Sequence, residues 1–370
     1  MAKSLSFIFI ILSLIFFTVA LQDKVYAIDV DGLNSCTSES AEETAACNGA
    51  CAVNGDGAII IHANGMPADA DNTSSYRDNC NMIPDNYKVN VYYGGLCTAD
   101  PYSATGGTVD YTTNCDLFFT SPDVSTTGTP INLVDNGDGT ASADSELVSG
   151  GINLGIKTYT HAFMILNNHL QVKHTQTYDF SLAAASGMAG GGATLSSGTT
   201  CWTIAAVSTY SNLDGTGHGE TLRTGSASDV AELSTKCGAT VDTTGDYQLD
   251  YATEIIETFG DADGNWGSDA IVNRWSYSVA SRGLDIGGTK AAIMLQSNNV
   301  DLATTMENGV RIFYIVALTN PLVITENTTT FNIGFGLTNS VSVDFTEGAA
   351  GALTNVKHGA DPIDIRFTAN

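Results

Sequence analysis

The stretch YKVNVYYGG, residues 87–95, alternates apolar or aromatic residues with polar ones. Every second residue from Tyr87 to Tyr93 falls on one face of an extended chain, and Lys88 and Asn90 fall on the other. Successive side chains of a β-strand point to opposite faces, so a period of two is the pattern of a half-buried strand. The stretch therefore predicts a strand that buries its odd-numbered face.

The same period of two recurs near the end of the chain. It runs through residues 331–337, through residues 341–345 after Asn339-Ser340, and through residues 363–367. Because hairpins join strands that are close in sequence, the first two runs are expected to pair as a hairpin and the third to form a closing strand.

Four other runs are apolar on both faces and suit strands in the interior of a sheet that is covered on both sides. They are GAIIIH at 57–62, DLFFT at 116–120, KAAIMLQS at 290–297 and GVRIFYIVAL at 309–318. Gly, Asn, Asp and Ser separate the runs at the spacing typical of a sandwich or jelly roll.

Helix signals are confined to two short segments, SASDVAELSTKCG at 226–238 and NNVDLATTMENG at 298–309, each ending at a glycine. The expected fold is all-β: an antiparallel β-sandwich or jelly-roll-like body with few short helices and a disulfide-stapled N-terminal part.

Residues 1–27 have the features of a signal peptide. Lys3 precedes a charge-free run at 5–20, and Val25 and Ala27 place small residues where a signal peptidase cleaves. The run is shorter than the roughly 20 apolar residues that span a bilayer, and no later segment suits a membrane helix. The mature chain is expected to be secreted, extracellular or at the cell surface, with the periplasm as an alternative and with no membrane span.

The mature chain divides by composition into two parts. Residues 28–128 are expected to form a Cys-rich N-terminal β region, and residues 129–370 a β-sandwich body. The alternative is a single domain, because a stapled N-terminal part can equally supply the first strands of one sandwich.

All eight cysteines follow the signal peptide, and an even number in an exported chain predicts disulfides. Local pairing predicts a bond from Cys97 to Cys115, which bracket the loop at residues 98–114, and a bond from Cys201 to Cys237. The other four, at 36, 47, 51 and 80, leave three pairings open. The two in CNGAC could instead bind a metal ion, although no second pair of similar spacing follows to complete a zinc site.

The chain carries 40 acidic and 14 basic residues, a formal net charge of −26. An excess of negative charge of this size repels polyanions, so nucleic acid and anionic membrane surfaces are not expected as partners. The charge is compatible with divalent cations and with cationic partners.

The stretch TYTHAFMILNNHLQVKHTQTY, residues 158–178, contains three of the six histidines. A two-residue turn at Asn167-Asn168 would make it a hairpin in which His161 faces His174. The two rings are expected to form a hydrogen-bonded cross-strand pair. The alternative is a transition-metal site, which needs a third protein ligand from elsewhere in the fold.

The stretch GDADGNWGSD, residues 260–269, contains the stronger of two oxygen-ligand patterns that suggest calcium as a cofactor. The weaker one, VDNGDGTASAD at residues 134–144, is expected to be a hairpin turn. Positions one, three, five and nine of a calcium loop are matched by Asp261, Asp263, Asn265 and Asp269. The match then fails, because Trp266 stands where an EF-hand has Gly and Val272 where it has Glu. The mismatches favour the alternative, an Asx-rich turn that its own side chains cap.

The sequence contains no G-x-S-x-G, H-E-x-x-H or Walker motif. The expected function is that of a secreted or cell-surface non-enzymatic β protein with a structural or adhesive role, whose partners are other copies of the chain or surface glycans. One alternative is a secreted carbohydrate-binding module, calcium-assisted, with aromatic residues that stack on sugars. Its candidate stacking residues are Trp202, Trp266, Trp275, Tyr92 and Tyr102. The other alternative is a secreted hydrolase, for which paired carboxylates would be needed.

Overall fold

A computed structural model of the chain describes residues 50–62, 67–68, 79–102, 108–136, 140–143, 154–181, 188–190, 197–209, 234–256, 275–278, 288–304, 308–329, 331–338, 340–345, 355–361 and 363–369. Within these ranges the chain is nearly all β-structure, as the sequence predicts. The strands form three sheets in which most pairs are antiparallel. None of the helices in these ranges has the length and apolar character needed to cross a membrane.

The largest sheet has thirteen strands. Its main path runs through β16 (Trp275–Ser278), β17 (Gly288–Leu295), β18 (Arg311–Val323), β7 (Thr158–Asn167), β3 (Asn86–Cys97), β5 (Thr129–Asp135), β6 (Thr140–Ala143), β19 (Phe331–Gly336) and β22 (Asp364–Ala369). Beside this path pair β4 (Cys115–Thr120), β8 (His169–Lys173), β13 (Ala206–Thr209) and β15 (Ala252–Ile255).

Two smaller sheets lie beside the large one. The four-stranded sheet has the order β1 (Ile59–Ile60), β9 (Thr175–Asp179), β12 (Thr200–Thr203) and β14 (Thr235–Gly238). The five-stranded sheet has the order β11 (Ser197–Gly198), β10 (Met188–Gly190), β21 (Asn355–Ala360), β20 (Val341–Phe345) and β2 (Asn79–Met82). The two sheets pack against each other, since β12 and β14 contact β21.

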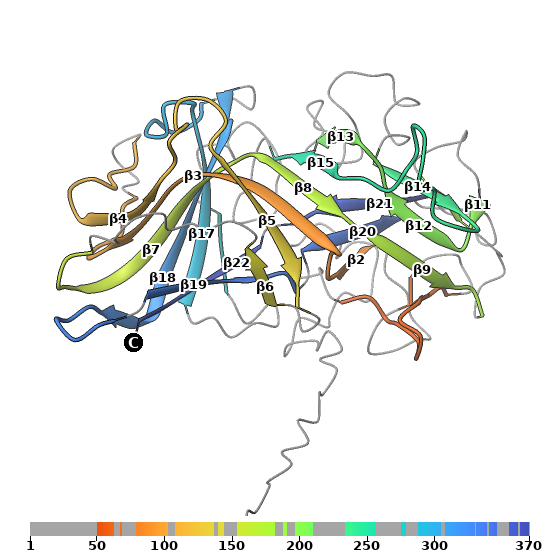
Figure 1. Cartoon of the computed structure of the whole chain (residues 1–370), viewed down its shortest axis with the longest axis horizontal. Helices are drawn as coiled ribbons and strands as arrows, with labels where there is room; N and C mark the ends of the chain where they lie inside the picture. Colours follow the sequence, from red (N-terminus) through yellow and green to blue (C-terminus); the bar gives the residue numbers. More distant parts are fainter. Residues whose placement is uncertain are drawn as a thin grey trace, which may run out of the picture.

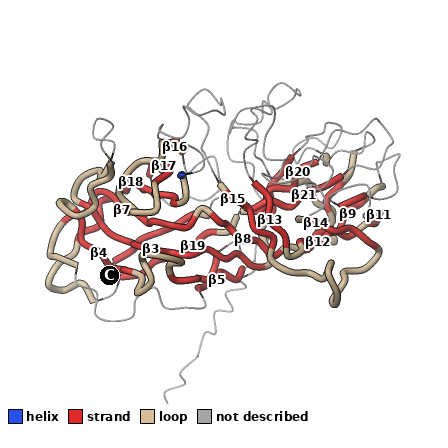
Figure 2. Tube along the Cα trace, turned by 90° about the horizontal axis from the view of Figure 1, so that it is seen from above, coloured by secondary structure: helices blue, strands red, loops and turns tan. Residues whose placement is uncertain are grey.

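The molecule therefore has two lobes, at the left and right of Figure 1. The first lobe is the part of the large sheet made of β3, β4, β7, β17 and β18, with the loops around it. The second lobe consists of the two smaller sheets. In Figure 2, β8 and β15 lie between the lobes. The connection is continuous, because β8 ends at Lys173 in the large sheet and β9 begins at Thr175 in the four-stranded sheet.

Strand β3 confirms the predicted alternation and then changes it. Tyr87, Val89 and Val91 are buried in the main core. The register with β7 then shifts between Val91 and Tyr93, which leaves Tyr92 as an extra residue. After a β-bulge of this kind, the odd-numbered residues lie on the face of the sheet that the even-numbered residues occupied before it. Tyr92 accordingly lies in a second core on the other face of the sheet, with Tyr93 packed against that core.

Two glycines follow the bulge because aromatic rings lie directly against the backbone there. A Cβ atom on Gly94 would lie 2.4 Å from the ring of Phe118, and one on Gly95 would lie 2.4 Å from the ring of Phe163. Phe118 belongs to the main core and Phe163 to the second core. The two glycines therefore mark the two faces on which β3 is covered.

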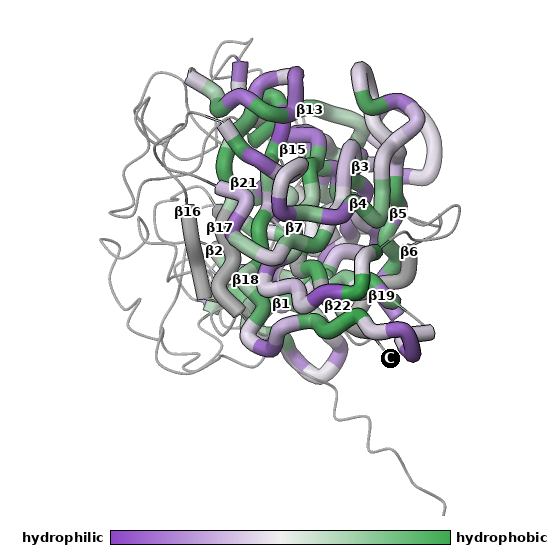
Figure 3. Tube along the Cα trace, turned by 90° about the vertical axis from the view of Figure 1, so that its left-hand side faces the viewer, coloured by the Kyte–Doolittle hydropathy of each residue, from purple (hydrophilic) through white to green (hydrophobic). Residues whose placement is uncertain are grey.

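The interior strands of the first lobe are buried on both faces, as predicted for residues 290–297 and 309–318. In β18, Ile312 and Tyr314 face the main core, whereas Phe313 and Ile315 face the second core. Loop residues such as Val109 contribute to that second core. Figure 3 shows apolar (green) and polar (purple) segments alternating along the strands at this end of the molecule.

The predicted hairpin near the C-terminus is wrong. Strand β19 pairs with β22 and β6, whereas β20 pairs with β2 and β21 in the five-stranded sheet. The predicted strands exist, but a period of two determines which face a residue occupies and carries no information about its partner strand. The predicted hairpin at residues 134–144 agrees with the antiparallel pairing of β5 with β6, and residues 137–139 and 144 lie outside the described ranges.

Over most of their described residues the predicted helices are wrong, although Asn308 is in a 3₁₀-helical turn. In the segment 226–238, residues Thr235–Gly238 form β14, which pairs with β12. In the segment 298–309, Asn299 has a positive φ of 63° within a turn, and Leu302 bridges to Leu295. Long-range pairing overrides the local helix signal in both segments.

Three disulfides join parts of the described chain. Cys97–Cys115 and Cys201–Cys237 confirm the predicted pairs. The third bond joins Cys51 to Cys80, so the metal-binding alternative for Cys47 and Cys51 is wrong, because a disulfide sulfur is no longer a thiolate ligand.

Several predictions fall on residues 1–49, which lie outside the described ranges. They include the signal peptide and the last two cysteines, Cys36 and Cys47. Since the other six cysteines are paired, a fourth disulfide would have to join these two. The predicted boundary near residue 128 separates β3 from β5 and β7, which are its neighbours in the sheet.

Candidate functional site

The histidine-rich stretch is one extended path and contains no hairpin. Both β7 and β8 pair antiparallel with β3, so they run in the same direction. Between them, Asn168 is buried, and its Nδ2 donates to the carbonyls of Ile256 and Gly309 at 2.9 and 3.0 Å. The predicted turn at Asn167-Asn168 is therefore wrong, because neighbouring strands hold Asn168 inside the sheet.

The predicted pairing of His161 with His174 is wrong for the same reason. Thirteen residues of extended chain separate the two, a path of up to about 40 Å. The alternative of a metal site at these two histidines depended on their being neighbours, and the structure does not bring them together. Among the described residues there is no group of three or more His, Cys, Asp or Glu that could hold a metal ion.

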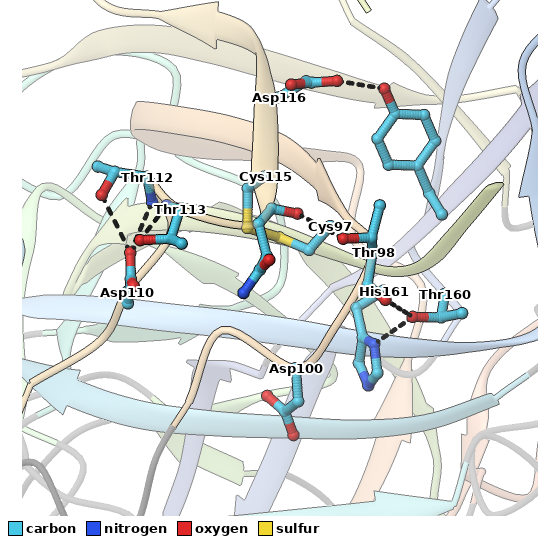
Figure 4. The surroundings of a disulfide bond; sticks show 12 residues. Cys97, Thr98, Asp100, Asp110, Thr112, Thr113, Cys115, Asp116, Thr160 and His161 are labelled. Carbon is cyan, nitrogen blue, oxygen red and sulfur yellow. Dashed lines mark hydrogen bonds between the residues drawn. A yellow bond between two sulfur atoms is a disulfide. The ribbon is translucent and has the colours of Figure 1, made fainter. Parts of the chain in front are cut away.

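His161 lies beside the Cys97–Cys115 disulfide at one end of the first lobe (Figure 4). Its Nδ1 is 2.9 Å from Oγ1 of Thr160, and that hydroxyl also donates to the carbonyl of Thr98 at 3.1 Å. The ring is therefore bound to the loop that the disulfide closes.

Two carboxylates near this disulfide organise the surrounding loops (Figure 4). Asp110 accepts three hydrogen bonds of 3.0 Å from Thr112 and Thr113. Hydrogen bonds from Thr113 first, and then from Thr112, lower the pKa of Asp110 to about 2. Both threonines lie within three residues of Asp110, so this carboxylate caps its own turn.

The second carboxylate, Asp116, accepts hydrogen bonds from the backbone N–H of Gly155 and from Nζ of Lys157, both at 3.0 Å, and from the hydroxyl of Tyr159. Burial raises its pKa, but these hydrogen bonds outweigh burial, and the pKa of Asp116 is lowered. The carboxylate ties β4 to the start of β7, which is a structural role.

A buried group of three titratable residues lies in the second lobe. His174 follows β8, Tyr178 lies in β9 and His358 lies in β21. The imidazole centroids of His174 and His358 are 5.0 Å apart, with the rings at 68°. The hydroxyl of Tyr178 is 2.8 Å from Nε2 of His358. All three side chains are buried, so substrate cannot reach them from solvent.

Burial changes the titration of all three groups. It lowers the pKa of His174 to about 4 and raises the pKa of Tyr178 well above its usual value. Burial first, and then the neighbouring His174, lower the pKa of His358 well below its usual value. Desolvation always disfavours the charged form, so both imidazoles are neutral and Tyr178 keeps its proton near pH 7.

A buried ion pair joins the large sheet to the second lobe. Glu254 in β15 binds Nζ of Lys357 in β21 at 2.8 Å, and its second carboxylate oxygen accepts the backbone N–H of Ala360 at 2.9 Å. Only 5% of the Glu254 side chain is exposed. The carboxylate therefore takes the place of a strand partner at the edge of β21.

The other predicted ligand-binding residues divide into two groups. The calcium candidates Asp261, Asp263, Asn265 and Asp269, together with Trp266, lie outside the described residues. Of the proposed sugar-stacking residues, Trp202 and Tyr92 are buried, so this part of the carbohydrate-binding alternative is wrong. Tyr102 is half-buried.

Comparisons of the chain with models of protein families, with curated proteins and with solved structures gave no match. Function is therefore inferred from the residues themselves. The sequence identified His174 but neither of its neighbours, because Tyr178 and His358 are 180 residues apart. No spacing pattern could have joined them.

Proposed function

We propose that the chain is an exported, non-enzymatic β protein with a structural or adhesive role outside the cell or at its surface. The observation that carries the proposal is the placement of the disulfides. Cys97 faces Cys115 in the register of β3 and β4, and Cys201 faces Cys237 in that of β12 and β14. Each bond therefore reinforces strands that are already hydrogen-bonded to each other.

Disulfides of this kind make the folded protein resistant to unfolding. They stabilise the fold mainly by lowering the entropy of the unfolded chain, and they persist in oxidising compartments. The third bond follows the same rule, since Cys51 and Cys80 stand next to the bridged residues Ala50 and Asn81.

The chemistry of the interior supports a non-enzymatic role. Catalytic groups must contact substrate, and binding sites are open clefts. Among the described residues, His174 and His358 are instead closed inside the second lobe, and Glu254 is buried where the large sheet meets it. The carboxylates Asp110 and Asp116 of the first lobe are bound by nearby hydroxyl and backbone groups.

The test is to isolate the native protein and determine where it is and how it assembles. N-terminal sequencing should give Ile28, and electron microscopy of surface fractions should show ordered filaments, lattices or a surface layer. Dispersed monomers in the medium that hydrolyse a polymer, or that bind glycans on an array, would overturn the proposal in favour of a hydrolase or a carbohydrate-binding module.

A further inference from the structure

Two imidazoles in the interior of the second lobe have nitrogen atoms with no hydrogen-bond partner among the described residues. Neither ring nitrogen of His174 has a hydrogen-bond partner, and neither does Nδ1 of His358. The relative exposure of the two residues is 2% and 0%. Buried polar atoms almost always have a partner, so three unpartnered nitrogens in one contact are an exception that requires an explanation.

The backbone holds both rings in place. The N–H of His174 donates to Oγ1 of Thr203 at 3.0 Å, and the N–H of His358 donates to Oγ1 of Thr235 at 2.8 Å. Thr203 and Thr235 lie in β12 and β14, which also carry a disulfide. Neither ring can turn towards solvent unless these strand contacts break.

The charged groups around the pair do not compensate a proton on either ring. Glu254, from β15, and Lys357, from β21, bind each other. A Cβ atom on Gly359 would lie 2.5 Å from a carboxylate oxygen of Glu254, and adjacent residues of a strand point to opposite faces. Glu254 therefore lies on the face of β21 opposite to His358.

The remaining elements packed on the rings bring no charge to them. Strand β9 contributes the Tyr178 hydroxyl, and β20 places Val343 opposite His358. Strands β12 and β14 contribute the hydroxyls of Thr203 and Thr235. Among the described residues around the rings, only the imidazoles themselves can gain a positive charge below neutral pH. Each ring's nearest neighbour of this kind is the other imidazole.

We propose that the His174–His358 contact is a pH-sensitive closure of the second lobe: a proton on either ring separates the sheet of β21 from that of β9, and the lobe opens in mildly acidic medium while the first lobe stays folded. The proposal does not depend on the proposed function. Among the described residues, no anion faces this position, so a buried cation there is strongly disfavoured and the closed lobe excludes it.

The pH range follows from the sign of the shifts. Both folded-state pKa values lie below the unfolded value of about 6.5. Each histidine therefore leaves stability unchanged above pH 6.5 and reduces it as the pH falls, until the folded pKa is reached, which for His174 is about 4. In this range the unfolding constant of the lobe should rise up to about tenfold per pH unit for each histidine.

The experiment uses the full, oxidised mature chain. Urea unfolding is measured at several pH values between about 7.5 and 4, together with hydrogen exchange of β9, β12 and β21 against β7 and β18. The expected result is an early loss of protection in β9, β12 and β21. Equal loss in both groups of strands would overturn the proposal.

Two variants assign the effect to the rings. His174→Leu removes no side-chain hydrogen bond, so it should fold, and it should remove up to about tenfold per pH unit from the acid response. His358→Gln keeps a polar group for Tyr178 and is the second variant if the first does not fold. His161→Gln, in the first lobe, is the matched control and should leave the response unchanged.

Two further outcomes would contradict the proposal. One is a His174→Leu variant with the acid response of the wild type. The other is stabilisation of the wild type, but not of His174→Leu, by added Zn²⁺ or Cu⁺, because a metal ion and not a proton would then occupy the pair.

Discussion

The two lobes fill their interiors with different chemistry, although both are built from alternating strands. In the first lobe, Tyr111, Phe163 and Phe313 pack with ring centroids 5.2 to 6.2 Å apart. In the second lobe, the corresponding interior contains His174 and His358. An apolar interior requires only that the side chains fill the available volume. A polar interior must also provide hydrogen-bond or ion-pair partners for its buried groups.

The two lobes are therefore sensitive to different changes. The aromatic interior does not titrate within the pH range of a culture medium, so its stability depends on packing. The second lobe also depends on buried polar contacts, such as that of Glu254 with Lys357 where the large sheet meets it. Four changes, taken from the largest expected effect to the smallest, test this difference.

The largest effect is expected on removal of the Cys201–Cys237 disulfide. Its cysteines are 36 residues apart, and those of Cys97–Cys115 are 18 residues apart. The chain-entropy estimate gives about 4 kcal/mol for the longer loop and about 3 kcal/mol for the shorter one. Urea unfolding of the two double Cys→Ala variants measures both. A larger loss of unfolding free energy on removal of Cys97–Cys115 than on removal of Cys201–Cys237 would contradict this prediction.

Removing the charge of Glu254 comes next. Glu254→Gln leaves Lys357 without its carboxylate partner in a largely buried position, which should cost about 3 kcal/mol. The matched control is Asp116→Asn, which removes the first-lobe ion pair with Lys157. Those two side chains are 21% and 47% exposed, so the control should cost only about 1 kcal/mol. Equal losses in urea unfolding would show that the second lobe does not depend on its buried ion pair.

A smaller effect is expected at the buried cation of the first lobe. Arg311 is 6% exposed, and its guanidinium lies 4.0 Å from the ring centroid of Tyr92 while donating to the carbonyls of Val310 and Thr126. Arg311→Lys loses the planar stacking and one donor, at about 1 to 2 kcal/mol. Thermal unfolding measures the loss, and an unchanged midpoint would contradict it.

The control for Arg311 is a cation above a ring in the second lobe. Nζ of Lys236 lies 4.8 Å from the ring centroid of Tyr247, and Tyr247 is 46% exposed. Water screens this contact, so Lys236→Ala should change stability by less than about 0.5 kcal/mol.

The difference between the lobes also explains how far the sequence could predict the fold. The strand at residues 87–91 was predictable, because a strand with one buried face has apolar residues at every second position of its sequence. The pair Cys97 and Cys115 was predictable because the two residues bracket one loop, residues 98–114. The bulge at Tyr92 was not, because it exists only in the register between β3 and β7.

The polar interior was the least predictable part. The pattern Asn167-Asn168 fits a turn and a bulge equally well in local geometry, and the choice is made by the carbonyls of Ile256 and Gly309. The contact of His174 with His358 likewise depends on two sheets meeting. The hydrophobic periodicity of a strand shows which face of the sheet a residue occupies. Which side chain it contacts across the sheets is decided only by the tertiary fold.

The smallest expected effect separates the lobes by the pH at which they respond. Asp110 is the first-lobe group whose pKa is lowered to about 2, by hydrogen bonds from Thr113 and Thr112. Because this value lies below the unfolded value of 3.8, Asp110 contributes its stability above pH 3.8 and loses it as the pH falls through about 2. In the second lobe, His174 responds at higher pH, between about 6.5 and 4.

Asp110→Asn should therefore flatten the loss of stability only in the lower range. The side chain is exposed, so solvent screening limits the change to about 0.5 kcal/mol. Thermal unfolding of the variant and the wild type at closely spaced pH values measures it, and Asp242→Asn is a control in an exposed loop of the second lobe. If Asp110→Asn altered stability between pH 6.5 and 4, the two lobes would share one acid response, and the separation of an apolar lobe from a titrating lobe would fail.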